Sequence, residues 1–255
     1  MRLVSAEFLK LRKRTGLILA AFGLTIVPGI IMLAATGGGD ADTGGLRTFA
    51  DQVELVASLS IVASILVGAT LGTSDVSSGV FRDLVVTGRS RLGLFAARAP
   101  AGLALVLAAS AAGLALAVLT AQLSAGTVQT SVDRLGTIAP SAGLLLETAA
   151  WLTLVCASSF ALALGVSSLV GSVGGAIASL LALWLVVTPL VQGIESLGWL
   201  SDALVISSLD QVMPHGLKAR EENLLPSLAV AIAALVVWAA VPLLAGAWRT
   251  MTRDA

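Results

Sequence analysis

The feature that most restricts the fold of this chain is a long run without any charged side chain, from Thr148 to Ile194. As one continuous helix, at a rise of 1.5 Å per residue, it would be roughly 70 Å long, which is more than two crossings of the hydrocarbon core of a bilayer. Pairs of small residues near its middle favour a tight turn. The run therefore predicts two membrane-spanning helices, at 144–166 and 172–191.

The composition excludes a soluble fold. The chain has 255 residues, of which 57% are hydrophobic and 12% are charged, and its mean hydropathy is +0.98. A soluble domain has too little interior to bury this much apolar surface, so the solvent must be lipid. We predict an all-α integral membrane protein with a single transmembrane domain over residues 1–255. Its six spans are expected at 15–36, 54–74, 99–123, 144–166, 172–191 and 225–248.

The first fourteen residues predict an amphipathic helix that lies in the membrane interface. On a helical wheel Val4, Phe8 and Leu11 share one face, and Lys10 lies opposite. Such a helix places its apolar side on lipid and its basic side toward the headgroups. The alternative is the charged region of a cleavable signal peptide, but the apolar run that follows is longer than such peptides usually have.

The basic residues predict the orientation of the chain. Segments 1–14, 72–98 and 249–255 hold eleven of the 15 Lys and Arg residues, and the opposite side holds the remaining four. The positive-inside rule then places both termini and the segment 75–98 in the cytoplasm. The excess of Arg over Lys and the abundance of Ala are typical of a GC-rich bacterial gene. We therefore expect a multi-pass protein of the bacterial cytoplasmic membrane.

Residues 192–223 predict short helices that dip into the outer leaflet before the sixth span. This segment mixes charged and apolar residues and is broken by Gly193, Gly198, Pro214 and Gly216. It is too polar to cross the bilayer, and too apolar for an open loop. We expect a re-entrant outer segment.

Several kinds of chemistry are absent from the sequence. No G-x-x-x-x-G-K-[ST] motif is present, so we expect no nucleotide hydrolysis by this chain. His215 and Cys156 are the only residues of their types and predict neither a metal site nor a catalytic base. The predicted spans hold essentially no ionisable side chains, which disfavours a carrier coupled to protons or ions. A path lined by apolar, Ser and Thr side chains suits an amphiphilic cargo, and we expect no enzyme and no nucleic-acid partner.

The polar segment 75–98 lies between the second and third predicted spans. Thr73, Ser74 or Ser77 can cap a helix there, and Gly88 can end it. The apolar residues Val80, Phe81, Leu84 and Val85 fall on one face of that helix. A cytosolic partner could bind this face; the alternative is a helix that rests on the inner leaflet.

The same segment resembles the permease subunits of ABC-2-type transporters. The spacing of Asp75, Gly79, Leu84, Arg91 and Arg98, with a turn at Gly88, is similar to a recurring pattern of that family. The N-terminal segment, with Glu7 and Lys10, is also similar to the family's interfacial helix. The chain departs from the pattern at two positions, where Val80 stands in place of the usual Thr and Gly88 in place of the usual Pro.

This resemblance implies that segment 75–98 is a coupling helix that docks on a separate cytosolic P-loop ATPase, which binds ATP and Mg²⁺. A second permease copy, identical or related, would complete an exporter of a drug, peptide or lipid. The residues it assigns to ATPase coupling are Asp75, Gly79, Val80, Phe81, Leu84, Gly88 and Arg91. Those it assigns to the interfacial helix are Glu7, Phe8, Lys10 and Leu11. A membrane scaffold or sensor with a partner-binding helix, or a secondary carrier, is the alternative.

Overall fold

The computed structural model describes residues 2–36, 46–77, 90–127, 140–194, 198–217 and 226–252. Within these ranges the chain is helical and contains no strand. The long helices are α1 (Arg2–Lys13), α2 (Thr15–Thr36), α3 (Leu46–Ser77), α5 (Arg91–Thr127), α6 (Ala142–Val170), α7 (Val173–Ala182) and α11 (Leu228–Thr252). The short ones are the π-helix η1 (Leu183–Val187), α8 (Thr188–Gln192), α9 (Gly198–Asp202), α10 (Val205–Gln211) and the 3₁₀-helix η3 (His215–Leu217).

Six helical segments among the described residues are long and apolar enough to cross a membrane, which confirms the predicted fold class. They are Thr15–Ala34, Leu46–Thr73, Arg91–Leu123, Ala142–Val170, Val173–Gln192 and Leu228–Thr252. Helices α3 and α5 are longer than the charge-free runs from which their spans were predicted. Helix α3 also includes Arg47 and Glu54, and α5 also includes Arg98. Charged residues end an apolar run without ending the helix.

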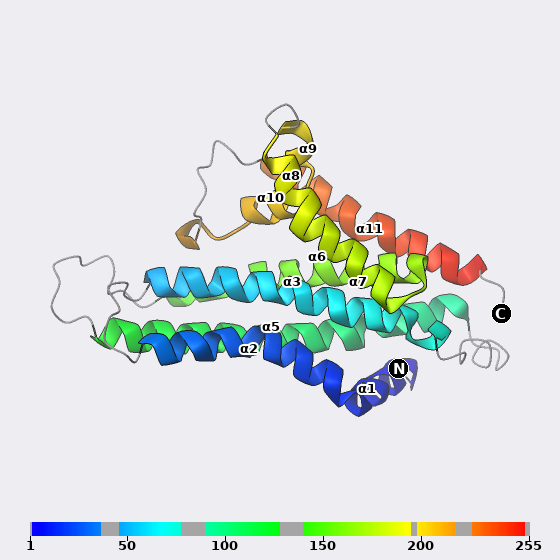
Figure 1. The fold of residues 1–255 in the computed structure, drawn as a ribbon, viewed down its shortest axis with the longest axis horizontal. Coiled ribbons are helices and arrows are strands. Elements are labelled where there is room, and N and C mark those ends of the chain that lie inside the picture. Colours follow the sequence, from blue (N-terminus) through cyan, green and yellow to red (C-terminus); the bar gives the residue numbers. More distant parts are fainter. Residues whose placement is uncertain are drawn as a thin grey trace.

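The helices form a bundle in which one group of helices is inclined to the other (Figure 1). Helices α2, α3 and α5 run nearly parallel along the long axis, whereas α7, α8 and α11 are inclined to them. Helix α6 packs against both α3 and α11 and so joins the two groups. We call the end that holds α1, the end of α3, the start of α5 and the end of α11 the basic end, and the other the far end.

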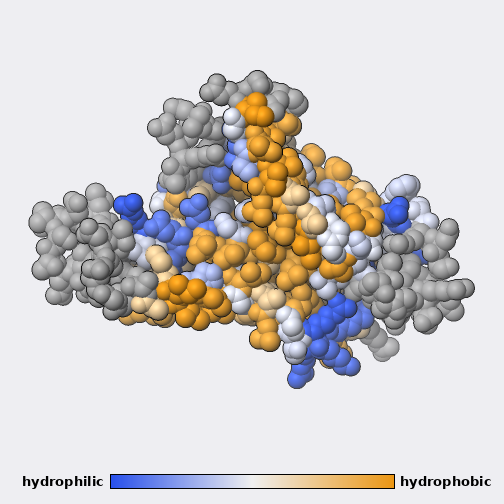
Figure 2. All heavy atoms as spheres, in the orientation of Figure 1, coloured by the Kyte–Doolittle hydropathy of each residue, from blue (hydrophilic) through white to orange (hydrophobic). Residues whose placement is uncertain are grey.

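The surface is apolar where a bilayer would surround it. Figure 2 shows hydrophobic residues over the middle of the visible face and hydrophilic residues gathered toward its ends, including the basic helix α1. Large exposed hydrophobic side chains occur on α2 and α11, among them Leu19, Ile31, Val236 and Leu244. Lipid is the solvent that such side chains require.

Glycines allow the helices of this bundle to approach closely. A Cβ at Gly68 would lie 2.7 Å from the Ala163 Cβ, and one at Gly72 would collide with the Ser167 hydroxyl, so the G-x-x-x-G spacing marks the contact of α3 with α6. On the other side of α6, a Cβ at Gly246 of α11 would lie 2.8 Å from the Gly165 carbonyl oxygen. Small residues thus set both of the principal contacts of α6.

Buried hydroxyl groups link the same helices. The Ser60 and Ser110 Oγ atoms are 2.7 Å apart, and Ser110 Oγ is 3.1 Å from Cys156 Sγ, which connects α3, α5 and α6. The Thr25 hydroxyl donates to the Ala109 carbonyl oxygen at 2.8 Å and connects α2 to α5. Hydrogen bonds of this kind hold helices together where lipid provides no hydrophobic drive for association.

Candidate functional site

Most of the predicted coupling residues lie outside the described part of the chain. Gly79, Val80, Phe81, Leu84 and Gly88 are in this group, so their predicted role stays a prediction. Asp75 falls in the last turn of α3, and Arg91 is the first residue of α5. The structure therefore describes the two helices that hold the segment between them.

Two arginines of α5 tie these helices together at the basic end. The side chain of Arg98 is 1% exposed and donates from Nη1 to the Gly72 carbonyl oxygen of α3 at 3.2 Å. Arg91 donates from Nη1 to the Met251 carbonyl oxygen of α11 at 2.9 Å. Guanidinium groups suit this task because they present several donors in a fixed plane. We call this set of contacts between α3, α5 and α11 the arginine frame.

Local sequence explains why α5 starts where it does. Ser90 precedes the helix, and its hydroxyl accepts from the Gly93 N–H at 3.2 Å, as an N-cap residue does. The first turns then bury Leu94 and Phe95. The start of α5 is therefore fixed both by its cap and by its core contacts, which holds Arg91 and Arg98 in place.

Helix α1 packs against the base of this frame. Leu11 is 5% exposed and belongs to the same buried cluster as Leu71 of α3 and Phe95 of α5. Glu7, one turn earlier, is 6% exposed and accepts from Lys10 Nζ at 2.7 Å. Phe8 is 45% exposed. One side of α1 thus joins the protein core, while Phe8 is available to lipid.

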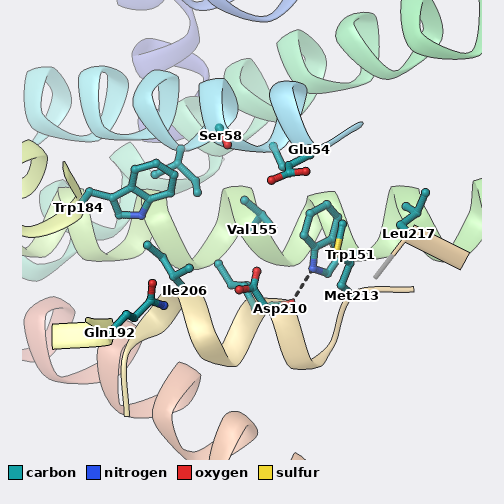
Figure 3. Close-up of a pocket in the computed structure, with 13 residues that line it drawn as sticks. Glu54, Ser58, Trp151, Val155, Trp184, Gln192, Ile206, Asp210, Met213 and Leu217 are labelled. Atoms are coloured by element: carbon teal, nitrogen blue, oxygen red, sulfur yellow. Dashed lines mark hydrogen bonds between the residues drawn. The ribbon is translucent and has the colours of Figure 1, made fainter. Parts of the chain in front are cut away.

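A cavity of about 320 Å³ lies in the far half of the molecule (Figure 3). Glu54 and Ser58, one turn apart on α3, line one wall, and Asp210 of α10 lines the facing wall. Trp151 of α6 and Trp184 of the π-helix lie toward its two ends. Its volume is within the range of small-molecule sites.

The tryptophans and the short helices fix the shape of this cavity. The Trp151 indole N–H donates to the Leu209 carbonyl oxygen of α10 at 2.9 Å. The Trp238 indole N–H of α11 donates to the Ala203 carbonyl oxygen at 2.8 Å. These two bonds attach the short helices to α6 and α11, and so hold the wall that carries Asp210.

Sequence reasoning did not find this cavity. Glu54 was expected only as the first residue of the second span, at 54–74, and no role was predicted for Trp151 or Trp184. The spacing of Glu54 and Ser58 on one helical face was a weak signal, because Asp210 faces them only once the chain has folded.

A metal site is not formed by the described residues, where no group of three His, Cys, Asp or Glu side chains comes together. The candidate site consists instead of the arginine frame at the basic end and the cavity in the far half.

Comparison with known proteins gives one family. The family model described as ABC-2 family transporter protein matches residues 3–183, which include α1 to α7 and reach the start of the π-helix. No curated protein matches the chain.

Proposed function

Because the chain belongs to the ABC-2 family of transporter proteins, we propose that it is the permease subunit of an ATP-driven exporter. The family match over 3–183, on a chain with six membrane-spanning helices, is the observation that carries this proposal. The chain is a membrane permease. The sequence has no P-loop motif, so ATP and Mg²⁺ are bound and ATP is hydrolysed by a separate cytosolic subunit.

Closure of the ATPase subunits, driven by ATP, moves segment 75–98. The arginine frame supports this role, because the ends of that segment emerge from α3 and α5, which Arg98 joins through the Gly72 carbonyl. Arg91 adds the end of α11. A displacement of the segment is then passed to α3 and α5, which the buried Arg98 bond joins, and more weakly to α11 through the exposed Arg91 bond. Such movement of helices shifts the permease between two states.

The cargo is amphiphilic or hydrophobic, such as a drug, a peptide or a lipid. Support comes from the buried polar groups of the described residues, most of which are hydroxyls such as Thr25, Ser60 and Ser110. The buried charged side chains among them are Glu7 and Arg98. Such a surface suits a cargo that itself prefers lipid. A second copy, identical or related, completes the translocation path.

The basic end faces the cytoplasm of a bacterial cell, and both termini lie there. The distribution of Lys and Arg supports this, because eleven of 15 fall in segments 1–14, 72–98 and 249–255, whose described residues lie at that end. Helix α1, with its exposed Phe8 and Leu9, then lies in the inner leaflet.

Purification of the tagged chain from its native membrane in mild detergent tests the proposal. We expect a stoichiometric soluble protein with a P-loop to co-purify, and Phe81→Glu with Leu84→Glu to abolish both its binding and its stimulated ATP hydrolysis. Leu123→Glu is the control, because Leu123 is a 52% exposed apolar side chain near the far end of α5, away from the proposed docking helix and the arginine frame. Unchanged ATPase binding in the double variant would exclude segment 75–98 as the docking site. Recovery of the chain alone would favour a scaffold, a sensor or a carrier.

A further inference from the structure

The outward face of α1 carries an apolar part and a basic part in succession along the helix. Phe8 and Leu9 are exposed large hydrophobic side chains. Arg12 and Lys13 follow one turn later and are exposed as well. Because residues four apart are neighbours on a helix surface, the two pairs form one continuous strip, which we call the α1 strip. It presents an apolar surface at one end and two positive charges at the other.

The opposite side of α1 is packed on the protein, which gives the α1 strip its direction. Glu7 and Leu11 are buried, and Leu11 belongs to the cluster that includes Leu71 and Phe95. Helix α1 contacts α5 and α2 through this side. The α1 strip therefore faces away from the bundle, toward whatever surrounds it.

The junction of α1 with α2 places the two cations where a membrane span begins. The Arg14 carbonyl oxygen accepts from the Leu17 and Ile18 N–H groups at 3.0 and 3.2 Å, so helical hydrogen bonding resumes directly after α1. The Arg14 N–H donates to the Leu11 carbonyl oxygen at 2.8 Å. The apolar span of α2 starts at Thr15, and α1 turns away from the axis of α2 there (Figure 1). Cations this close to the end of a span lie at the level of the lipid headgroups.

The charge of this region favours a negative partner. Segment 1–14 holds five Lys and Arg residues and one acid, Glu7. That acid is buried and accepts from Lys10 Nζ at 2.7 Å. Basic residues at a membrane surface are attracted to anionic phospholipids. A zwitterionic headgroup matches Arg12 and Lys13 less well, because its own cation is repelled by them.

From these observations we infer that the α1 strip binds an anionic phospholipid of the leaflet at the basic end. The headgroup lies at Arg12 and Lys13, and the acyl chains pack against Phe8 and Leu9. The apolar residues beside the cations favour a lipid over a soluble phosphate, because they bury their surface only in the membrane. Lipid binding by α1 goes beyond the proposed export function and rests on it only for the leaflet, which is the inner one when the basic end faces the cytoplasm.

A lipid bound here stabilises the end of the molecule that holds the arginine frame. Leu11 precedes Arg12 in α1 and packs in the cluster with Leu71. The next residue, Gly72, accepts from the buried Arg98. A ligand that binds the folded chain and not the unfolded one adds its binding free energy to the stability. Anionic lipid should therefore raise the melting temperature of the purified chain.

Native mass spectrometry of the purified full chain in mild detergent tests the inference. Phosphatidylglycerol and phosphatidylcholine with identical acyl chains are added at equal concentration, and the bound lipids are distinguished by mass. We expect phosphatidylglycerol adducts to dominate. Arg12→Gln and Lys13→Gln should each weaken phosphatidylglycerol binding roughly fivefold, which corresponds to about 1 kcal/mol per basic residue. Both variants should stay helical, because the helix propensity of Gln is close to that of Arg and Lys.

Arg47→Gln is the matched control, because Arg47 is an exposed cation in the first turn of α3, at the far end. It should change phosphatidylglycerol binding less than twofold. Phe8→Ser with Leu9→Ser keeps both cations and should weaken the binding of both lipids.

Equal binding of the two lipids by the parent chain, or an equal loss in Arg47→Gln, would overturn the inference. Displacement of phosphatidylglycerol by the same concentration of glycerol phosphate would assign the α1 strip to soluble phosphates and would overturn it as well. The assay contains neither ATP nor a partner protein, so its outcome is separate from that of the ATPase-docking experiment.

Discussion

Gly72 lies where α3 touches α6 with no room for a side chain. A Cβ there would collide with the Ser167 hydroxyl and lie 3.0 Å from the Leu164 backbone oxygen. We expect Gly72→Ala to destabilise the protein by about 1–3 kcal/mol, as overpacking does. The melting temperature of the purified chain in detergent should fall by roughly 2–10 °C.

The matched control for this change is Gly23→Ala in α2, where nothing lies within 4 Å of the added Cβ. It should keep or slightly raise the melting temperature, because Ala favours helix over Gly. An equal fall in melting temperature in both variants would show that the close contact of α3 with α6 does not require a glycine at position 72.

Arg98 joins α5 to α3 at the basic end and should contribute to the stability of the fold. Its side chain is 1% exposed and bonds to the Gly72 carbonyl oxygen, so Arg98→Met removes a charge-assisted hydrogen bond inside the protein. We expect a loss of about 1.5–3 kcal/mol in the free energy of unfolding, measured by thermal denaturation in detergent. Arg91→Met removes an exposed bond to the Met251 carbonyl and should cost less than about 1 kcal/mol. A larger effect at Arg91 than at Arg98 would contradict the assignment of Arg98 as the buried link.

Sequence reasoning found part of this residue-level structure. The spacing of Gly68 and Gly72 is typical of close helix contacts in membranes, although in a chain with 26 glycines the same spacing also arises by chance. Only the structure identifies α6 as the partner helix, because a G-x-x-x-G motif carries no information about what it packs against. Arg98 was noted from family resemblance, and its bond to Gly72 depends on the crossing of α3 and α5.

At the scale of elements, α1 differs from the spans in what it buries. Leu11 and Glu7 face the core, whereas Phe8 and Leu9 are 45% and 61% exposed. Burial of one leucine contributes about 1.5–3 kcal/mol, which is small beside the lipid insertion of six spans. Deletion of residues 1–14 should therefore leave membrane insertion intact but lower partner-stimulated ATP hydrolysis several-fold, because α1 packs beside Leu71 and Phe95 at the arginine frame.

Membrane fractionation and an ATPase assay on the co-purified complex measure the two effects separately. Phe8→Ser with Leu9→Ser is the companion variant, since it keeps the core contact of Leu11 and weakens only the lipid-facing side. Loss of the truncated chain from the membrane fraction would show that α1 is needed for insertion, against the expectation.

Charge-free runs predict the long helices of this fold but not its irregular turn or its cavity. Charge-free runs predict the membrane spans well because burial of backbone in lipid demands helices of a fixed length. The same runs cannot predict the π-turn at Leu183–Val187, which lies inside an unbroken apolar segment. They also cannot predict the cavity, because Glu54, Trp151 and Asp210 come from three separate elements and meet only through the packing of α3, α6 and α10.

At the scale of the whole molecule, Ser90 and Ser141 offer a matched pair that reports orientation. Both are exposed N-cap residues, with Ser90 at the basic end and Ser141 at the far end, so a cysteine disturbs each in the same way. The native Cys156 is fully buried and should react with a maleimide only after denaturation. Each single-cysteine variant can therefore be labelled without removing the native thiol.

With the basic end in the cytoplasm, a membrane-impermeant maleimide should label Ser141→Cys in intact cells and Ser90→Cys only in inside-out vesicles. The physical reason is the excess of Lys and Arg at the basic end, which opposes translocation of that end during insertion. The reverse pattern would place the proposed ATPase-docking segment outside the cell and exclude coupling through it. Labelling of both positions from the same side would instead require an even number of crossings between them, against the single passage of α5 from Arg91 to Thr127.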